Sequence, residues 1–200
     1  MNILSIDFDI IMSKDLNLYN NLVGPERPLD AIQKEFPVLN NVKANLNNYQ
    51  AIFTIINNIA LGLHPDDIKV ALSHEDIKYL LEGQSNVNVF NIDNHHDIGY
   101  RTNNPEVCGC GNWAGYYLKN NTISHYTWIK NPYSEVDLNC NNERIIISNL
   151  LDFDFSTLPK IDKLFICFSP EWVNMDYHPL FFTILDTLNA YKNCHLPISY

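Results

Sequence analysis

The sequence lacks several features that define common protein classes. No run of apolar residues approaches the ~20 that a membrane-spanning helix needs, although 46% of the residues are hydrophobic. Cationic residues are few: 13 Lys and Arg stand against 23 Asp and Glu, which gives a formal net charge of -10. Nucleic-acid binding relies on a basic surface. We therefore expect a globular protein that binds neither membranes nor nucleic acids.

Cysteine is scarce, and the amino-terminal residues lack the marks of a secretory signal. Of the five cysteines, Cys108 and Cys110 are too close together for a CxxC metal or redox pattern, so reduced structural thiols are expected. The opening residues MNILSIDFDIIM have no basic segment and carry acids within the apolar stretch. These features favour a cytoplasmic location.

Neither a repeat nor a linker divides the chain, so residues 1–200 are predicted to form a single domain. Short apolar runs typical of buried strands lie at 2–6, 68–73, 87–92, 123–129, 144–150 and 163–169, and helical patterns lie at 28–36, 49–60, 75–83, 112–120 and 178–190. This alternation predicts a three-layer α/β/α fold, in which helices cover both faces of a mainly parallel sheet.

Acids and histidines follow three of the predicted strands at the point where each strand ends. The residues are Asp7 and Asp9 after NILSI, His74 after IKVALS, and Asp93, His95 and Asp97 after VNVFNI. Because sites in such sheets form beyond the carboxyl ends of the strands, we expect these side chains to lie together. In an extended chain, alternate residues share a face, which would align each DxD and DxHxD set.

Four carboxylates gathered at one edge would repel each other unless cations compensated them. Oxygen-rich sites with one or two imidazoles and no thiolate favour manganese or magnesium. Six ligands are too many for one tetrahedral ion and suit two ions that share carboxylates. Each element also has a simpler interpretation: an isolated DxD, such as Asp152 and Asp154, is usually a turn or a cap, and a lone histidine such as His74 is often a core hydrogen-bonding residue.

Several motifs together resemble the arginase and agmatinase superfamily. DNHHD matches its D-x-H-x-D metal motif, and SIDFD resembles its S-x-D-x-D motif. IDFDI, DNHHD, CGNWAGYY and FSPEWV resemble segments of the short arginase-like proteins, a subgroup that includes the peptide arginases. This resemblance extends from one end of the chain to the other.

The resemblance implies roles for individual residues. Asp93 and Asp7 would bridge two manganese ions, His74 and Asp97 would complete one ion, and His95 and Asp9 the other. Glu171 in SPEW would bind a guanidinium group. The implied activity is conversion of arginine side chains in a peptide, possibly one with a leader segment, to ornithine with release of urea.

The chain departs from the family in ways that affect the fold and the proton transfer. In the family the S-x-D-x-D segment comes late in the chain, whereas here it comes first, which implies a permuted order of the metal-binding strands. His74 lies where the family has the histidine of a G-G-D-H segment, but the two glycines of that segment are absent. The family histidine that follows D-x-H-x-D and transfers protons has no clear counterpart in this chain. Asn112 and His125 are the candidates for its role. Trp172, Trp113 and His178 are candidates for the wall of the substrate site.

Two other functions remain compatible with the residues. A phosphoesterase of the Asp-His-His family also combines an early DxD with paired histidines, although Asn94 stands where its motif has Asp. A relative without activity could use the metal site to support a peptide-binding module. The sequence leaves the oligomeric state open.

Overall fold

The computed structural model describes residues 1–12, 42–99, 107–132, 134 and 142–194 of the chain. Its strands are β1 (Asn2–Asp7), β2 (Ile68–Ala71), β3 (Val87–Ile92), β4 (Ile123–Lys130), β5 (Ile145–Asn149) and β6 (Lys163–Cys167). Its helices are α3 (Leu46–Ala60), α4 (Lys78–Leu81), α5 (Trp113–Lys119) and α6 (His178–Cys194), with short 3-10 turns η1 (Phe8–Ile11), η3 (Pro65–Asp67), η4 (His74–Ile77), η5 (Phe155–Thr157), η6 (Pro170–Trp172) and η7 (Met175–Tyr177).

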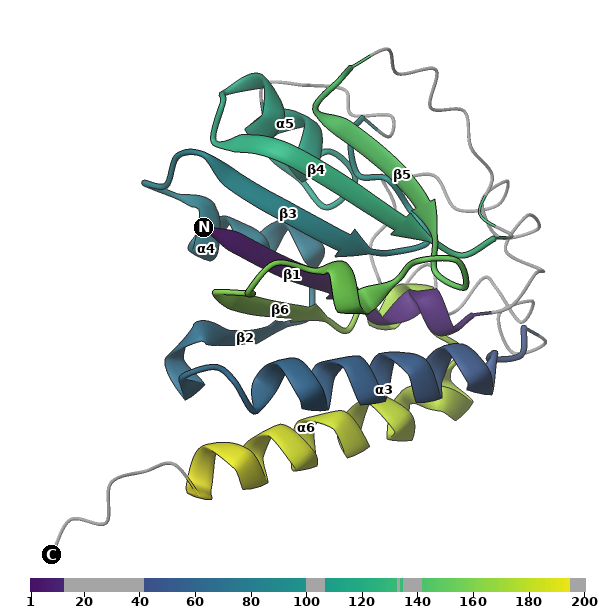
Figure 1. Ribbon diagram of the computed structural model, residues 1–200. Helices are drawn as coiled ribbons and strands as arrows, with labels where there is room; N and C mark the ends of the chain where they lie inside the picture. The colour runs from purple at the N-terminus through teal and green to yellow at the C-terminus, as the bar shows by residue number, and fades with distance from the viewer. Residues whose placement is uncertain (13–41, 100–106, 133, 135–141, 195–200) are drawn as a thin grey trace, which may run out of the picture.

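The six strands form one sheet in the order β2-β6-β1-β3-β4-β5, and every pair is parallel (Figure 1). All six predicted strands are present, and the predicted three-layer fold is confirmed, with a sheet that is wholly parallel. The helix predicted at 28–36 lies outside the described residues. The helix predicted at 75–83 is shorter than expected, because the chain first forms the 3-10 turn η4.

Helices cover both faces of the sheet, so the central strands are apolar on both sides. On β1, Leu4 and Ile6 belong to the core beneath α3 and α6, whereas Ile3 belongs to the core beneath α4 and α5. β6 repeats this alternation with Ile166 and Phe165. Strands buried on both faces need a continuous apolar run. This requirement explains why the central strands could be predicted from the sequence.

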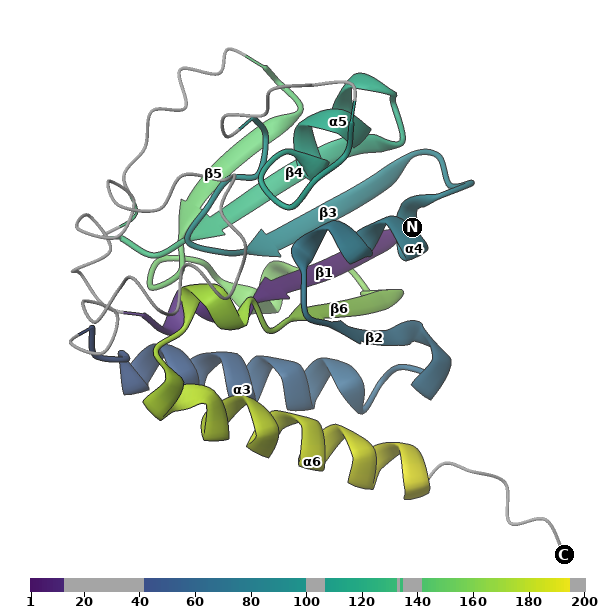
Figure 2. The ribbon, with the colours of Figure 1, turned by 180° about the vertical axis from the view of Figure 1, so that it is seen from behind.

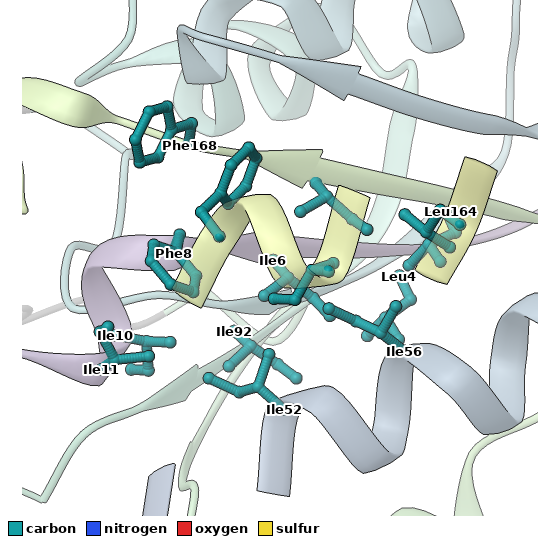
Figure 3. Packing of buried hydrophobic residues seen from close by; sticks show 14 of the residues in the cluster. Leu4, Ile6, Phe8, Ile10, Ile11, Ile52, Ile56, Ile92, Leu164 and Phe168 are labelled. Atoms are coloured by element: carbon teal, nitrogen blue, oxygen red, sulfur yellow. The ribbon is translucent and has the colours of Figure 1, made fainter. Parts of the chain in front are cut away.

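The two helical layers lie on opposite sides of the sheet. α3 and α6 run side by side in both views, and α4 and α5 lie across the face seen in Figure 2. Figure 3 shows Ile52 and Ile56 of α3 directed toward Ile92 and Leu4 of the sheet. No helix in the described part of the chain is long and apolar enough to cross a membrane.

The sheet order creates a switch point beside β1. After β1 the chain passes to β2 on one side of the sheet, whereas after β3 it passes to β4 on the other side. Loops that diverge in this way leave a crevice beyond the carboxyl ends of the strands, where ligands bind in open α/β sheets. The predicted metal ligands lie at or just after the carboxyl ends of β1, β2 and β3.

Close packing of α5 against the loop after β3 requires a glycine at position 115. A Cβ atom there would lie 1.9 Å from the carbonyl oxygen of Ile98. We expect Gly115→Ala to lower the free energy of unfolding by about 1–3 kcal/mol, as overpacked sites do, in urea titrations. Gly62→Ala is the control, since its Cβ would meet no atom closer than Ile59 O at 3.6 Å. Equal stability of the two variants would contradict this account.

Candidate metal centre

The structure brings all six predicted ligands to the same edge of the sheet. Asp7 ends β1, Asp9 lies in η1, His74 opens η4 after β2, and Asp93, His95 and Asp97 lie in the loop after β3. Five of the six residues are almost wholly buried, and the side chain of His95 retains 17% of its exposure. Segments far apart in the sequence thus supply one polar cluster at the switch point.

One part of the cluster surrounds the imidazole of His74. Its Nδ1 atom lies 3.2 Å from Asp7 Oδ2, 3.1 Å from Asp93 Oδ2 and 3.2 Å from Asp97 Oδ2. Ligand atoms of Asp7, His74 and Asp93 all lie within 4.8 Å of one another, a spacing that could hold a metal ion.

A second group adjoins the first through the other oxygen of Asp93. His95 Nδ1 lies 3.0 Å from Asp9 Oδ2 and 3.7 Å from Asp93 Oδ1. Asp9, Asp93 and His95 also meet the 4.8 Å spacing. Asp93 is therefore common to both groups, whereas Asp7 belongs to the His74 group alone, so that bridging by Asp7 stays a prediction.

Burial and mutual repulsion perturb the pKa values of the cluster. Burial, followed by the charges of Asp7 and Asp93, raises the pKa of Asp9 well above its usual range. Burial and Asp93 raise the pKa of Asp97 to about 7. Burial lowers the pKa of His74 and of His95, but their carboxylate partners outweigh it and raise both well above the ordinary value. Protonated imidazoles thus supply the positive charge that the acids require.

The residues present also fit a bound cation. Asp9 Oδ2 is buried and lies 3.0 Å from His95 Nδ1, and Asp9, Asp93 and His95 offer ligand atoms within 4.8 Å of one another. A cation among these atoms would balance the buried acids in place of the proton on the imidazole. The donor set contains oxygen and imidazole nitrogen but no thiolate, which suits a hard or borderline divalent ion.

Serine hydroxyls orient two of the candidate ligands. Ser5 Oγ lies 2.7 Å from Nε2 of His74, which leaves Nδ1 facing the acids. The hydroxyl of Ser169 donates to Asp7 Oδ2 at 2.7 Å. Such partners fix ring and carboxylate orientation in metal sites. Neither serine was predicted as a site residue, although Ser5 shares the face of β1 that Asp7 occupies.

Asp93 is held by a further hydrogen-bonded chain. The amide of Asn91 donates to Asp93 Oδ2 at 3.1 Å and to the hydroxyl of Tyr126 at 2.9 Å, and Trp128 Nε1 donates to Asp93 O at 2.9 Å. The backbone N–H of His95 donates to Asp93 Oδ1 at 2.8 Å. The carboxylate shared by the two groups is thereby fixed at both oxygens.

The residues converge for a different reason from the one the sequence suggested. Extended backbone was expected to align each set, but β3 ends at Ile92 and the chain from Asp93 to Asp97 is a loop, with Asp97 in a left-handed conformation at φ 49°. β1 likewise ends at Asp7, and Asp9 lies in a 3-10 turn. Turns, and not strand alternation, direct these side chains inward.

Two residues predicted to act on the substrate support the site's structure. Trp113 is fully buried and donates from Nε1 to Asp97 Oδ2 at 2.6 Å, which favours a structural role over its predicted place in the substrate wall. The side chain of Asn112 accepts from Gly109 N at 2.7 Å and donates to Val107 O at 2.9 Å. Asn112 therefore shapes the loop before α5, and these contacts give no support to a catalytic role.

Two histidines predicted for the site do not join the cluster. His125 is exposed, pairs in register with Asn88 near the amino end of β3, and lies 3.2 Å from its Oδ1. It lies at the opposite end of the sheet from the cluster, a position that gives no support to the predicted proton-transfer role. His178 Nε2 contacts Val173 O at 3.1 Å, and its ring packs against Phe168, which indicates a structural role at the start of α6.

Glu171 and Trp172 lie beside the cluster in η6, which follows β6. The ring of Trp172 lies 5.1 Å, centroid to centroid, from that of His95. Burial, together with the charge of Asp7, raises the pKa of Glu171 to about 7. The structure therefore puts a partly buried carboxyl group and an aromatic ring next to the candidate metal centre.

Comparison with known proteins found no match: no protein-family model, curated protein or solved structure is similar to this chain.

Metal binding at this centre is expected to release protons. The pKa values of His74 and His95 are raised, so both rings carry protons near neutral pH in the metal-free protein, whereas ligation requires neutral rings. Affinity for Mn²⁺ should therefore fall as pH decreases from 8 to 6, by about tenfold per unit for each proton released. Titration calorimetry in buffers of different ionisation enthalpy measures this directly. An affinity independent of pH would contradict the assigned ligands.

Proposed function

We propose that the protein is a binuclear manganese hydrolase that converts arginine side chains within a peptide to ornithine and urea. The observation that carries this proposal is Asp93, a buried carboxylate common to two adjoining groups of ligands. Sharing of one carboxylate by two ions lets a single site hold two positive centres a short distance apart, as hydrolytic two-metal sites do.

Manganese is proposed because four carboxylates accompany only two imidazoles. Carboxylate-rich sites suit magnesium and manganese, while imidazole extends the preference toward transition metals. The resemblance of DNHHD and SIDFD to the arginase metal motifs gives the same assignment. On this basis His74 and Asp97 would hold one ion, His95 and Asp9 the other, and Asp93 and Asp7 would be shared by both.

When bound, the ions would lower the pKa of a shared water, so that hydroxide is available near neutral pH. The remaining task is to hold the guanidinium carbon within reach of that water. Glu171 suits this role, because a carboxylate binds a guanidinium through two parallel charge-assisted hydrogen bonds. Loss of the proton from Glu171 is favoured when a cationic partner approaches, despite the burial that raises its pKa. Trp172 would limit movement of the arginine side chain.

A peptide is proposed as the substrate in place of free arginine. The sequence contains no counterpart of the arginase motifs that bind the α-carboxylate and α-amine, and a peptide has no such free groups at an internal arginine. A net charge of -10 would also attract cationic segments.

Incubation with Mn²⁺ and an arginine-containing peptide should lower the peptide mass by about 42 Da per arginine, the change set by urea-releasing hydrolysis. Mass spectrometry and urea assay measure this change. The same assay with free arginine, and with a phosphodiester, separates the alternatives. Turnover of free arginine alone would indicate an ordinary arginase, and turnover of the phosphodiester alone would indicate a phosphoesterase. No turnover despite two bound ions would favour a binding module.

Glu171→Gln tests the guanidinium partner, since it retains size and removes charge. It should weaken two charge-assisted bonds worth about 1.5–3 kcal/mol each and lower kcat/KM at least about tenfold, with manganese content unchanged. Asp176→Asn, which neutralises an exposed acid five positions later, is the matched control and should retain wild-type activity. Equal activities of the two variants would remove Glu171 from the proposed substrate site.

A further inference from the structure

Ser169 has an unusual backbone conformation beside the metal centre. In the described part of the chain, four residues other than glycine have positive φ: Asn86, Asp97, Asn121 and Ser169. Asn and Asp tolerate this left-handed region better than other side chains. Ser169 is the exception, with φ 43° and ψ 57°. Pro170 adds to the strain, because a residue before proline is disfavoured in helical conformations.

Contacts on every side hold Ser169 in this conformation. Its N–H donates to Leu72 O at 3.1 Å, and its carbonyl accepts from Trp172 N at 2.8 Å. The hydroxyl, in a residue only 3% exposed, donates to Asp7 Oδ2 at 2.7 Å. Ser169 thus connects the chain after β2, the turn η6 and the first metal-binding carboxylate.

The oxygen that Ser169 contacts is the one that faces the metal-binding histidine. Asp7 Oδ2 lies 3.2 Å from His74 Nδ1, while Asp7 Oδ1 accepts from Asp9 N at 3.2 Å. A hydrogen bond to each oxygen fixes the rotation of the carboxylate. Without the hydroxyl, Oδ2 would lose the contact that holds it toward His74 from the side of β6.

We propose that Ser169 is a positioning residue, whose strained backbone places its hydroxyl so as to orient Asp7 for the metal. Strained backbone persists where the surroundings enforce it, and it concentrates at functional sites. The same residue begins the segment that carries Glu171, so one contact also sets the guanidinium-binding carboxylate in relation to Asp7. This inference rests on the proposed function only in requiring that the cluster binds manganese.

Two substitutions separate the hydroxyl from the backbone. Ser169→Ala removes the hydroxyl and keeps the steric strain, whereas Ser169→Gly removes the hydroxyl and relieves the strain, because glycine accepts positive φ without cost. Both should weaken Mn²⁺ binding by about tenfold or more, as loss of a ligand's hydrogen-bond partner does. In metal-free protein, the Gly variant should unfold at a higher temperature than the Ala variant.

Asn86 provides the matched control, because it has φ 54° and lies exposed before β3, at the end of the strand remote from the metal centre. Asn86→Ala and Asn86→Gly should show the same order of unfolding temperatures with unchanged Mn²⁺ affinity. A Gly variant of Ser169 with wild-type affinity would overturn the proposal, since the hydroxyl would then be dispensable.

Failure of this inference is distinguishable from failure of the proposed function. Wild-type protein that binds manganese and releases urea, with unchanged affinity in both Ser169 variants, would refute the role of Ser169 alone. Weakened affinity in both variants of a protein that releases no urea would support Ser169 and refute the activity. A wild-type chain that binds no manganese would overturn both.

Discussion

Four carboxylates buried at one end of a sheet define the electrostatic constraint that the rest of this structure meets. The four acids, Asp7, Asp9, Asp93 and Asp97, are buried in the protein interior, where an unbalanced charge has a high free-energy cost. Two imidazoles and a set of serine, asparagine and tryptophan donors offset the charge only in part, because four acids face two imidazoles. A divalent cation satisfies this constraint better than protons, because it compensates several acids at once.

The hydrophobic core beneath α4 and α5 makes this constraint more severe and fixes the orientation of His74. The ring of His74 stacks on Phe165 at 5.7 Å and lies 4.9 Å from the ring of Trp113, so aromatic surfaces exclude water from its sides. Electrostatic interactions strengthen where water is excluded. The same packing that stabilises the sheet therefore holds the imidazole in one orientation toward the acids.

Sequence reasoning succeeded where a single physical requirement governs a segment. The four inner strands are largely buried and must be apolar, whereas the edge strands β2 and β5 keep exposed residues and were predicted from their short apolar runs alone. Acids at strand ends are conspicuous. The partners of those acids were not predictable, because Ser169 and Trp113 reach them through backbone turns and helix packing that leave no periodic signal. The position of His125 was not predictable for a related reason. Its residue type suited proton transfer, but the register of β4 puts it beside Asn88, at the end of the sheet remote from the cluster.

The position of β6 has a consequence for the order in which the chain becomes a protein. β6 is the last strand in the sequence, yet it lies between β1 and the edge strand β2. While a ribosome synthesises the chain from its amino end, β1 can pair with β3, but β2 cannot join the sheet until residues 163–167 emerge. Asp7 belongs to β1, and His74 follows β2. The His74 part of the cluster therefore assembles only after residues 163–167 have emerged, whereas Asp9, Asp93 and His95 follow β1 and β3, which pair with each other directly.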